Sequence, residues 1–140
     1  MALPQHLHLR VVSVERMLVN EQVDEVEIPG ITGYFGVLPG HTPLLASLNA
    51  GELWYRQGTM IQYLAIAFGF AEVEPDSVTI LTRIAEKGVD IDIARAEAAR
   101  KRAEERLAKP PIDIDFERAR IALLKSLTRL RVAERARIRS

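Results

Sequence analysis

The chain has 140 residues, of which 48% are hydrophobic and 27% charged, a balance typical of a folded globular protein that excludes an intrinsically disordered chain. It contains no cysteine, which excludes disulfides, thiolate metal sites and a cysteine nucleophile. The net charge is zero, but residues 1–91 carry 5 Lys or Arg against 11 Asp or Glu and residues 116–140 carry 8 against 2, so we expect two functional halves and an acidic partner for the second.

The first half of the chain predicts β-strands. Between residues 7 and 85 apolar side chains alternate with polar ones, the period of a half-buried strand, as in Leu7–Val11 and Glu25–Ile28. The run Ser77–Ile84 places four side chains on its core face: Val78, Ile80, Thr82 and Ile84. Turn signals separate the runs at Pro29-Gly30, Asn49–Gly51, Gln57-Gly58 and Pro75–Ser77. Many short strands with regular turns favour a β-sandwich or barrel.

The segment Gly33–Leu45, GYFGVLPGHTPLL, has the glycines of a phosphate-binding loop but not its spacing. His41 stands where a P-loop needs lysine, and Pro39 lacks the backbone N–H that such a loop points at phosphate. His41 has no evident nucleophile or acid partner, so we interpret it as structural, and we expect the segment to be a stiff crossover. Its tip, Ile31–Tyr34, combines apolar and aromatic residues with glycine, which favours contact with another protein.

After Gly88 the apolar period becomes that of a helix. Asp90 or Asp92 can cap a first helix that ends before Pro110, and a second helix is expected from near Asp113 or Asp115 to Arg137. The first helix has a stripe made mostly of alanine: Ala96, Ala99, Ala103 and Leu107. The second has a stripe of Ala119, Leu123, Leu127 and Leu130. The short connection predicts an antiparallel hairpin.

The predicted fold class is therefore β + α in two domains, a β-sandwich over residues 1–87 and an α-helical hairpin over residues 88–140. Burial of apolar area contributes about 25 cal/mol per Å2, and alanine methyl groups bury little area. Undocking the hairpin from the sandwich should therefore cost little free energy. A permanently packed hairpin is the alternative. The first ten residues lack the features of a signal peptide, and the longest apolar run, Tyr63–Ala71, is about half as long as a bilayer requires, so we expect no direct membrane insertion.

Three blocks, Val26–Leu53, Phe68–Thr82 and Ile91–Leu107, resemble in this order the epsilon subunit of bacterial F-type ATP synthases. The resemblance implies a β-sandwich of about ten strands followed by a helical hairpin. It also implies a non-catalytic rotor subunit of the central stalk that requires no cofactor and couples proton flow to ATP synthesis. The implied partners are the gamma subunit, the c-ring and the alpha and beta subunits of the head. The implied location is the cytoplasmic face of the bacterial inner membrane, where the subunit is peripheral.

The resemblance also implies contact sites. The loop facing the c-ring matches Ile31, Thr32, Gly33 and Tyr34. Many relatives have an acidic residue at the position of Tyr34, so a charged contact does not carry over to this chain. The hairpin is regulatory in the family: it lies folded on the β-domain or extends along gamma into the head, where it restrains ATP hydrolysis. The basic residues matching the contact with an acidic segment of the beta subunit are Arg118, Arg120, Lys125, Arg129, Arg131, Arg135 and Arg137.

The segment Ile91–Ala96, IDIARA, resembles the nucleotide-binding pattern of those relatives whose compact hairpin binds ATP. Regulatory ATP is the one ligand that this implies, and the residues implied to bind it are Glu86, Asp92, Arg95, Ala96, Arg102 and Arg129, with Lys125 as an alternative on the second helix. Arg95 and Arg102 are seven residues apart and so share a helix face, about 10 Å from each other. The competing interpretation is that Glu105 pairs with Lys101 or Arg102 along the helix.

Two other classes of function have less support in the sequence. A nucleic-acid-binding module could use the basic second helix, but Phe116 is the one aromatic residue there, and the acidic β-domain would repel phosphate. An enzyme would need a nucleophile, a base and an orienting group, or metal ligands at a suitable spacing, and the sequence offers no catalytic residues and no metal site in such an arrangement.

Overall fold

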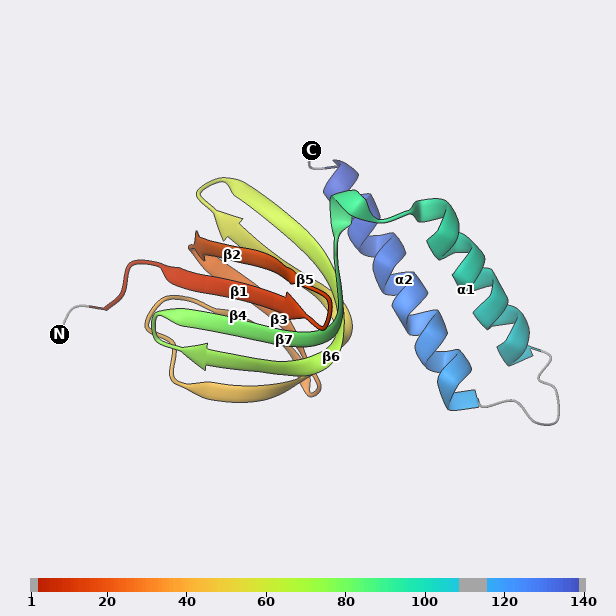
Figure 1. Cartoon of the computed structure of the whole chain (residues 1–140), viewed down its shortest axis with the longest axis horizontal. Helices are drawn as coiled ribbons and strands as arrows, with labels where there is room; N and C mark the ends of the chain where they lie inside the picture. Colours follow the sequence, from red (N-terminus) through yellow and green to blue (C-terminus); the bar gives the residue numbers. More distant parts are fainter. Residues whose placement is uncertain (1–2, 109–115, 139–140) are drawn as a thin grey trace.

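The structure is a computed structural model that describes residues 3–108 and 116–138. The first domain contains the strands β1 (Leu7–Ser13), β2 (Met17–Val23), β3 (Glu25–Gly30), β4 (Gly33–Val37), β5 (Leu44–Gln57), β6 (Met60–Glu74) and β7 (Ser77–Lys87). A short 3-10 helix, η1 (Gly88–Asp90), leads to the helices α1 (Ile93–Ala108) and α2 (Phe116–Ile138). Figure 1 shows the helical hairpin packed against one end of the strand domain. The prediction of a β-domain followed by a helical hairpin is confirmed.

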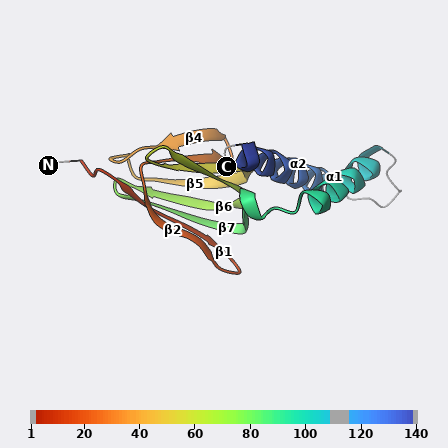
Figure 2. The same ribbon diagram turned by 90° about the horizontal axis from the view of Figure 1, so that it is seen from above.

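The strands form one sheet in the order β2-β1-β7-β6-β5-β3-β4, and only the β1/β7 pair is parallel among the described strands. The sheet curves over itself into two layers (Figures 1 and 2). Its core lies between the layers and receives side chains from every one of these strands. Leu7, Leu9, Val26 and Ile28 are fully buried there, as the alternating pattern predicts.

A bend at Phe68-Gly69 explains why seven strands occur where about ten were expected. Both residues have positive φ angles, 64° and 120°, and the pairing of β6 with β5 and with β7 skips Phe68. A Cβ added at Gly69 would lie 2.0 Å from the carbonyl oxygen of Leu81, so only glycine fits. Strands β5, β6 and β7 are 14, 15 and 11 residues long, and each counts once although it passes from one layer to the other.

The structure corrects three details of the prediction, of which the first two follow from this bend. Thr82 is buried as expected, and its hydroxyl donates a hydrogen bond to the carbonyl oxygen of Phe68 at 2.7 Å, but Ile84 lies beyond the bend and is 46% exposed. Asn49–Gly51 is not a turn, because it lies within β5, where Ala50 pairs with Ala67 and Gly51 with Ile66. The turn predicted at Pro29-Gly30 falls at residues 31–32, since Gly30 still pairs with Gly33.

The hairpin is attached to the sandwich mainly through α2. Asp92 caps α1 as predicted, because its Oδ1 accepts a hydrogen bond from the Arg95 backbone N–H at 3.1 Å. In α1 the buried alanines are Ala96 and Ala103, whereas Val132 and Ala133 of α2 belong to the cluster shared with β6. The predicted start of the second helix, at Asp113 or Asp115, and Pro110-Pro111 lie outside the described residues. No helix in the described part is long and apolar enough to cross a membrane.

Candidate functional site

The main candidate site is the interface between α2 and the outer face of β5 and β6. Trp54 pairs with Tyr63 and Glu52 with Ala65 across these two strands, so all four side chains share one face of the sheet. Val132 and Ala133 of α2 pack on this face. The apolar contact is small, because only short side chains of α2 take part in it.

Gly88 lets α2 approach closely at the end of β7. A Cβ added at this position would lie 2.7 Å from the Cβ of Ala136 and 3.1 Å from Cγ1 and the carbonyl oxygen of Val132. Those distances are shorter than ordinary contacts, so the packing of α2 against η1 requires glycine here. The Arg137 guanidinium also donates to the carbonyl oxygen of Ile91 at 3.1 Å, which ties the end of α2 to the start of the hairpin.

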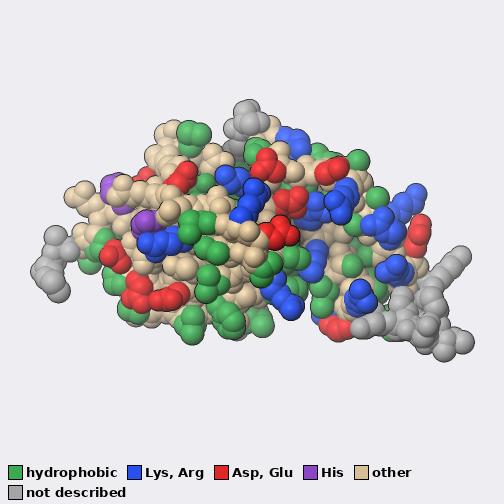
Figure 3. Space-filling view, viewed as in Figure 1, with side chains coloured by type: hydrophobic (Ala, Val, Ile, Leu, Met, Phe, Trp, Pro, Cys, Tyr) green, Lys and Arg blue, Asp and Glu red, His purple; other side chains and the backbone are tan. Residues whose placement is uncertain are grey.

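Two ion pairs join the basic α2 to the acidic β-domain. Arg129 holds Glu86 of β7 with both ends of its guanidinium, Nε to Oε2 at 2.8 Å and Nη2 to Oε1 at 3.1 Å. Arg135 donates from Nη1 to Oε1 of Glu52 at 2.8 Å. The Lys125 ammonium lies 5.7 Å from the centre of the Phe68 ring. Figure 3 shows Lys and Arg side chains gathered over the hairpin, so the opposite charges of the two halves meet at their interface.

Glu52 is the unusual member of this interface. The residue is only 6% exposed, and its Oε2 atom has no hydrogen-bond partner within the described residues. Burial raises the pKa of Glu52 above its ordinary value, and the charges of Arg135 and Arg131 oppose this only in part. Glu52 was not among the site residues predicted from the sequence. Its one signal is an acidic residue on the same strand face as Trp54, where an apolar residue would be expected.

A cavity of about 290 Å3 lies between β6, β7 and the two helices. Its lining includes Ala65, Ile66, Ala67, Ile84, Ala99, Lys125, Ser126 and Thr128. Of the residues predicted to bind ATP, only Glu86 and Arg129 line it, and they pair with each other. Arg95 and Arg102 lie on the exposed face of α1, Ala96 is buried and Asp92 acts as the helix cap. The structure therefore brings together two of the six predicted residues, with Lys125 and Ala99 beside them.

The basic residues predicted to contact the beta subunit are divided between the interface and the surface. Arg129, Arg135 and Arg137 make contacts within the chain. Arg131 is exposed, and Arg118 and Arg120 lie in the first turns of α2, where Arg120 pairs with Glu117.

The predicted contact loop Ile31–Tyr34 forms the turn between β3 and β4. Ile31 is 65% exposed, and Thr32 and Gly33 are exposed as well. The Tyr34 hydroxyl accepts a hydrogen bond from the Glu52 backbone N–H at 3.1 Å, which fixes its ring against β5. Leu44 and Leu45 line the same shallow groove and are exposed. These two leucines were not among the predicted contact residues, although two adjacent apolar residues after Pro43 break the alternating pattern and could have identified them.

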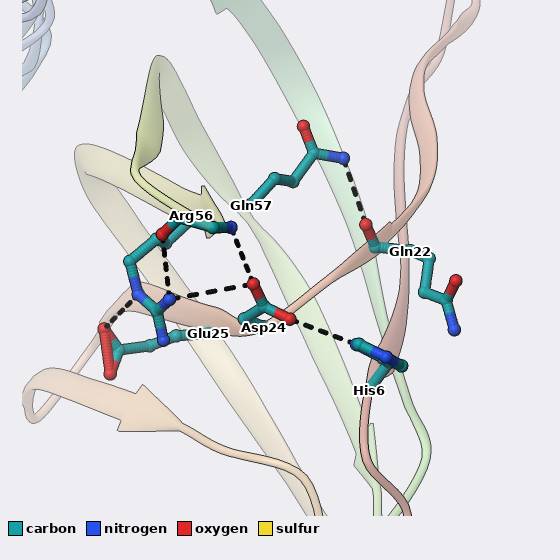
Figure 4. A network of polar contacts seen from close by, with 7 residues as sticks. His6, Gln22, Asp24, Glu25, Arg56 and Gln57 are labelled. Carbon is teal, nitrogen blue, oxygen red and sulfur yellow. Dashed lines mark hydrogen bonds and ion pairs between the residues drawn. The ribbon is translucent and has the colours of Figure 1, made fainter.

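A second polar network is remote from the hairpin (Figure 4). Asp24 accepts from the Gly58 backbone N–H at 2.7 Å and contacts His6 Nδ1 at 3.1 Å. These contacts, led by the Gly58 hydrogen bond, lower the pKa of Asp24. Arg56 lies between Asp24 and Glu25, at 3.6 and 3.8 Å. The network joins the β2–β3 corner to the β5–β6 turn and is structural. Across the described residues no three His, Asp or Glu side chains are placed to hold a metal ion.

The fold and the interface together define a two-domain protein-binding subunit, in which a β-sandwich with an exposed apolar loop carries a docked basic hairpin. Residues 6–88 match the model of the ATP synthase, Delta/Epsilon chain, beta-sandwich domain, and residues 90–134 match the long alpha-helix domain of the same chain. The chain therefore belongs to the ATP synthase delta/epsilon chain family. The prediction of an epsilon-type subunit of the ATP synthase central stalk is confirmed, and the nucleic-acid alternative is not favoured.

Individual relatives agree with this assignment. The ATP synthase epsilon chain of Syntrophobacter fumaroxidans is 47% identical over 131 residues, which cover 94% of this chain and 98% of the relative. The epsilon chain of Lawsonia intracellularis is 48% identical over 103 residues, 74% of this chain and 77% of that one. A chain in the Euglena gracilis mitochondrial ATP synthase aligns with a TM-score of 0.81, over 99% of this chain and 84% of the other, at 23% identity. The last match supports the fold.

Proposed function

We propose that this chain acts in the central stalk of a bacterial F-type ATP synthase, peripheral to the cytoplasmic face of the inner membrane. Its β-sandwich binds the gamma subunit and the c-ring, and its hairpin regulates ATP hydrolysis by leaving the sandwich and extending along gamma into the head. The observation that carries the regulatory part is the interface of α2, in which a few short apolar side chains and two ion pairs hold the basic helix.

Such an interface can open at modest free-energy cost. The side chains of Arg129 and Glu86 are still 24% and 28% exposed, so water screens part of their attraction and can solvate both groups when the helix leaves. Undocking frees Arg129 and Arg135 from their carboxylates and leaves them available to an acidic segment of another subunit. The exposed Arg131 already faces outward in the docked form. The same helix can therefore serve both states.

The test is the ATP hydrolysis rate of the assembled complex with the full chain and with a chain lacking Asp92–Ser140. Deletion should raise hydrolysis while gamma binding persists, because the core between the two layers of the sandwich is made by strands alone. A full-length chain with Glu117→Gln is the matched control, since it alters an exposed ion pair within α2 and leaves the interface intact. An unchanged rate in a complex that still contains the truncated chain would refute regulation by the hairpin.

We also propose regulatory ATP as a ligand of the docked form. Support comes from the cavity under the hairpin, which has apolar walls at Ala65–Ala67 and Ala99, the Lys125 ammonium, and the Arg129 guanidinium paired with Glu86. A ligand that binds only the docked state stabilises it by RT ln(1 + [L]/Kd), about 2.7 kcal/mol at 100 times Kd. That energy is enough to bias an interface this small.

The ATP proposal is tested by titration calorimetry on the whole chain. Arg129→Ala should weaken binding because Arg129 borders the cavity, and Arg120→Ala, at an exposed position on the same helix, should not. Arg95→Ala and Arg102→Ala decide whether the exposed face of α1 takes part. No heat at millimolar ATP would remove the nucleotide from the regulatory scheme.

A further inference from the structure

The position of Glu52 gives the docked hairpin an unfavourable contact. Strand β5 alternates, so that Leu53 and Tyr55 point into the sandwich core while Glu52 and Trp54 point toward α2. The surroundings of Glu52 on this outer face are the apolar cluster of Tyr63, Ala65, Val132 and Ala133. A carboxylate there is removed from water by the helix that packs over it.

The hydrogen bonding of Glu52 is only half complete. Oε1 accepts from Arg135 at 2.8 Å, but Oε2 has no partner among the described residues and almost no contact with solvent. The Arg135 side chain is 53% exposed, so its charge is largely screened by water, whereas the Glu52 side chain is 7% exposed. An ionised oxygen without a partner raises the free energy of the state that buries it. Replacing such a buried pair by apolar contacts is often neutral or stabilising.

We propose that Glu52 is a built-in release element for the hairpin: its half-paired carboxylate raises the free energy of the docked state, so that α2 leaves more readily than an apolar contact would allow. When α2 leaves, Oε2 regains water and Arg135 becomes available to another acidic partner. The device keeps docking marginal without weakening the sandwich core, because Glu52 belongs to the outer face of β5. The inference rests on the proposed function only in that the hairpin undocks.

The proposal gives docking a pH dependence with a definite sign. The charged groups that act on Glu52 are Arg131 and Arg135 from α2 and Glu27 from β3. The residue opposite Glu52 on β6 is the uncharged Ala65. The Tyr34 hydroxyl contacts the backbone N–H of Glu52 and not its carboxylate. Burial raises the pKa of Glu52 in the docked state, so this state holds the proton more tightly than the undocked one. Docking should therefore strengthen as the pH falls from neutral toward 4.5, the ordinary value for this carboxyl.

The chain offers clean probes of this equilibrium. It has no cysteine, so Ala133→Cys places a single thiol in the interface, and it has one tryptophan, Trp54, which packs against the same cluster. In the full-length chain, the labelling rate of the buried thiol is divided by the rate for an exposed thiol at the same pH. This ratio is the equilibrium constant for undocking of the hairpin, here called the opening constant. A disulfide reagent that reacts in mild acid allows the pH range to be covered. Trp54 fluorescence then provides a second readout in chains without the added thiol.

In this background Glu52→Met should lower the opening constant about fivefold, because it removes a buried acceptor without a partner. Glu52→Gln should also lower it at neutral pH and abolish its pH dependence between neutral and 4.5. Arg135→Ala should raise it, because it leaves the Glu52 carboxylate without its ion pair, and acid should reverse that increase. Glu117→Gln, which removes an exposed carboxylate of the same helix, is the control and should change nothing at neutral pH.

Two results separate this inference from the proposed function. If the thiol labels only on global unfolding, the hairpin does not undock and the regulatory proposal fails with it. If the thiol labels by local opening, but Glu52→Met opens as readily as the parent chain or more readily, then Glu52 stabilises docking and the release element is refuted while undocking stands.

Discussion

The substitution Gly88→Ala should loosen the hairpin while leaving the sandwich intact. The added methyl would lie 2.7 Å from the Ala136 Cβ and 3.1 Å from two atoms of Val132, all on α2. Gly88 is not among the residues with positive φ, so the backbone at this position accepts alanine and the contact with α2 is what resists it. Overfilling a packed contact costs about 1–3 kcal/mol. If α2 relieves it by undocking, the opening constant rises by about 5- to 150-fold.

The assay is the thiol-labelling rate at Ala133→Cys, with unfolding in urea as a measure of the sandwich. Gly36→Ala is the matched control, because an added Cβ there meets no atom within 4 Å. The double variant Gly88→Ala with Ala136→Gly removes the closest contact and should restore part of the docking, although glycine in α2 itself costs about 1 kcal/mol. If Gly88→Ala leaves the labelling rate unchanged, the close approach of α2 does not limit docking and the reasoning fails. In the assembled complex the Gly88→Ala single variant should inhibit ATP hydrolysis more strongly than the parent chain, because more of its hairpin is undocked.

Three further predictions concern the sandwich. Tyr34→Phe removes the acceptor of a backbone N–H bond and should lower the free energy of unfolding by about 1 kcal/mol in urea; an unchanged midpoint and slope would mean that the bond is replaced by water. Burial, with the charge and hydrogen bond of Glu21, raises the pKa of Tyr55 to about 12, so its phenolate absorbance should appear near that pH. The free energy of unfolding should fall as the pH rises from 10.0 to 12, because the phenol ionises first in the unfolded chain. The lowered pKa of Asp24 contributes stability that is present above pH 3.8 and lost as pH falls through the folded value, so Asp24→Asn should flatten the acid end of the unfolding profile; an NMR titration of Asp24 with a midpoint at or above 3.8 would contradict this.

The elements of this fold follow from local periodicity, but the bend in the sheet does not. Alternation identified the buried side chains of β1 and β3, and the change of period at Gly88 identified the hairpin. The shape of β6 depends on Gly69, because the carbonyl oxygen of Leu81 on the neighbouring strand leaves no room for a side chain there. A glycine within a long apolar run gives no local sign of such a contact, so the strand count and the exposure of Ile84 could not be predicted.

The site shows the same division between local and long-range information. The spacing of Arg95 and Arg102 correctly placed them on one face of α1, and Asp92 correctly capped the helix. Which face turns toward the cavity is decided by the packing of Ala96 and Ala103, and that packing leaves both arginines outside. The burial of Glu52 depends on a helix more than 60 residues later in the chain, so the local pattern could mark Glu52 as an unusual acidic residue beside Trp54 but could not show what covers it.

Part of the opposite charge on the two halves of the chain is paired within the folded chain itself. In the docked form Arg129 and Arg135 are paired with carboxylates of the β-domain, and in the proposed extended form the same guanidinium groups face an acidic segment of another subunit. Salt screens both sets of pairs, so ionic strength should shift the balance less than it would if only one state were paired. The equilibrium between the docked and extended states then depends on contacts that salt does not screen. The apolar cluster around Val132 and the close packing at Gly88 favour docking. The Oε2 atom of Glu52, which has no partner among the described residues, opposes it.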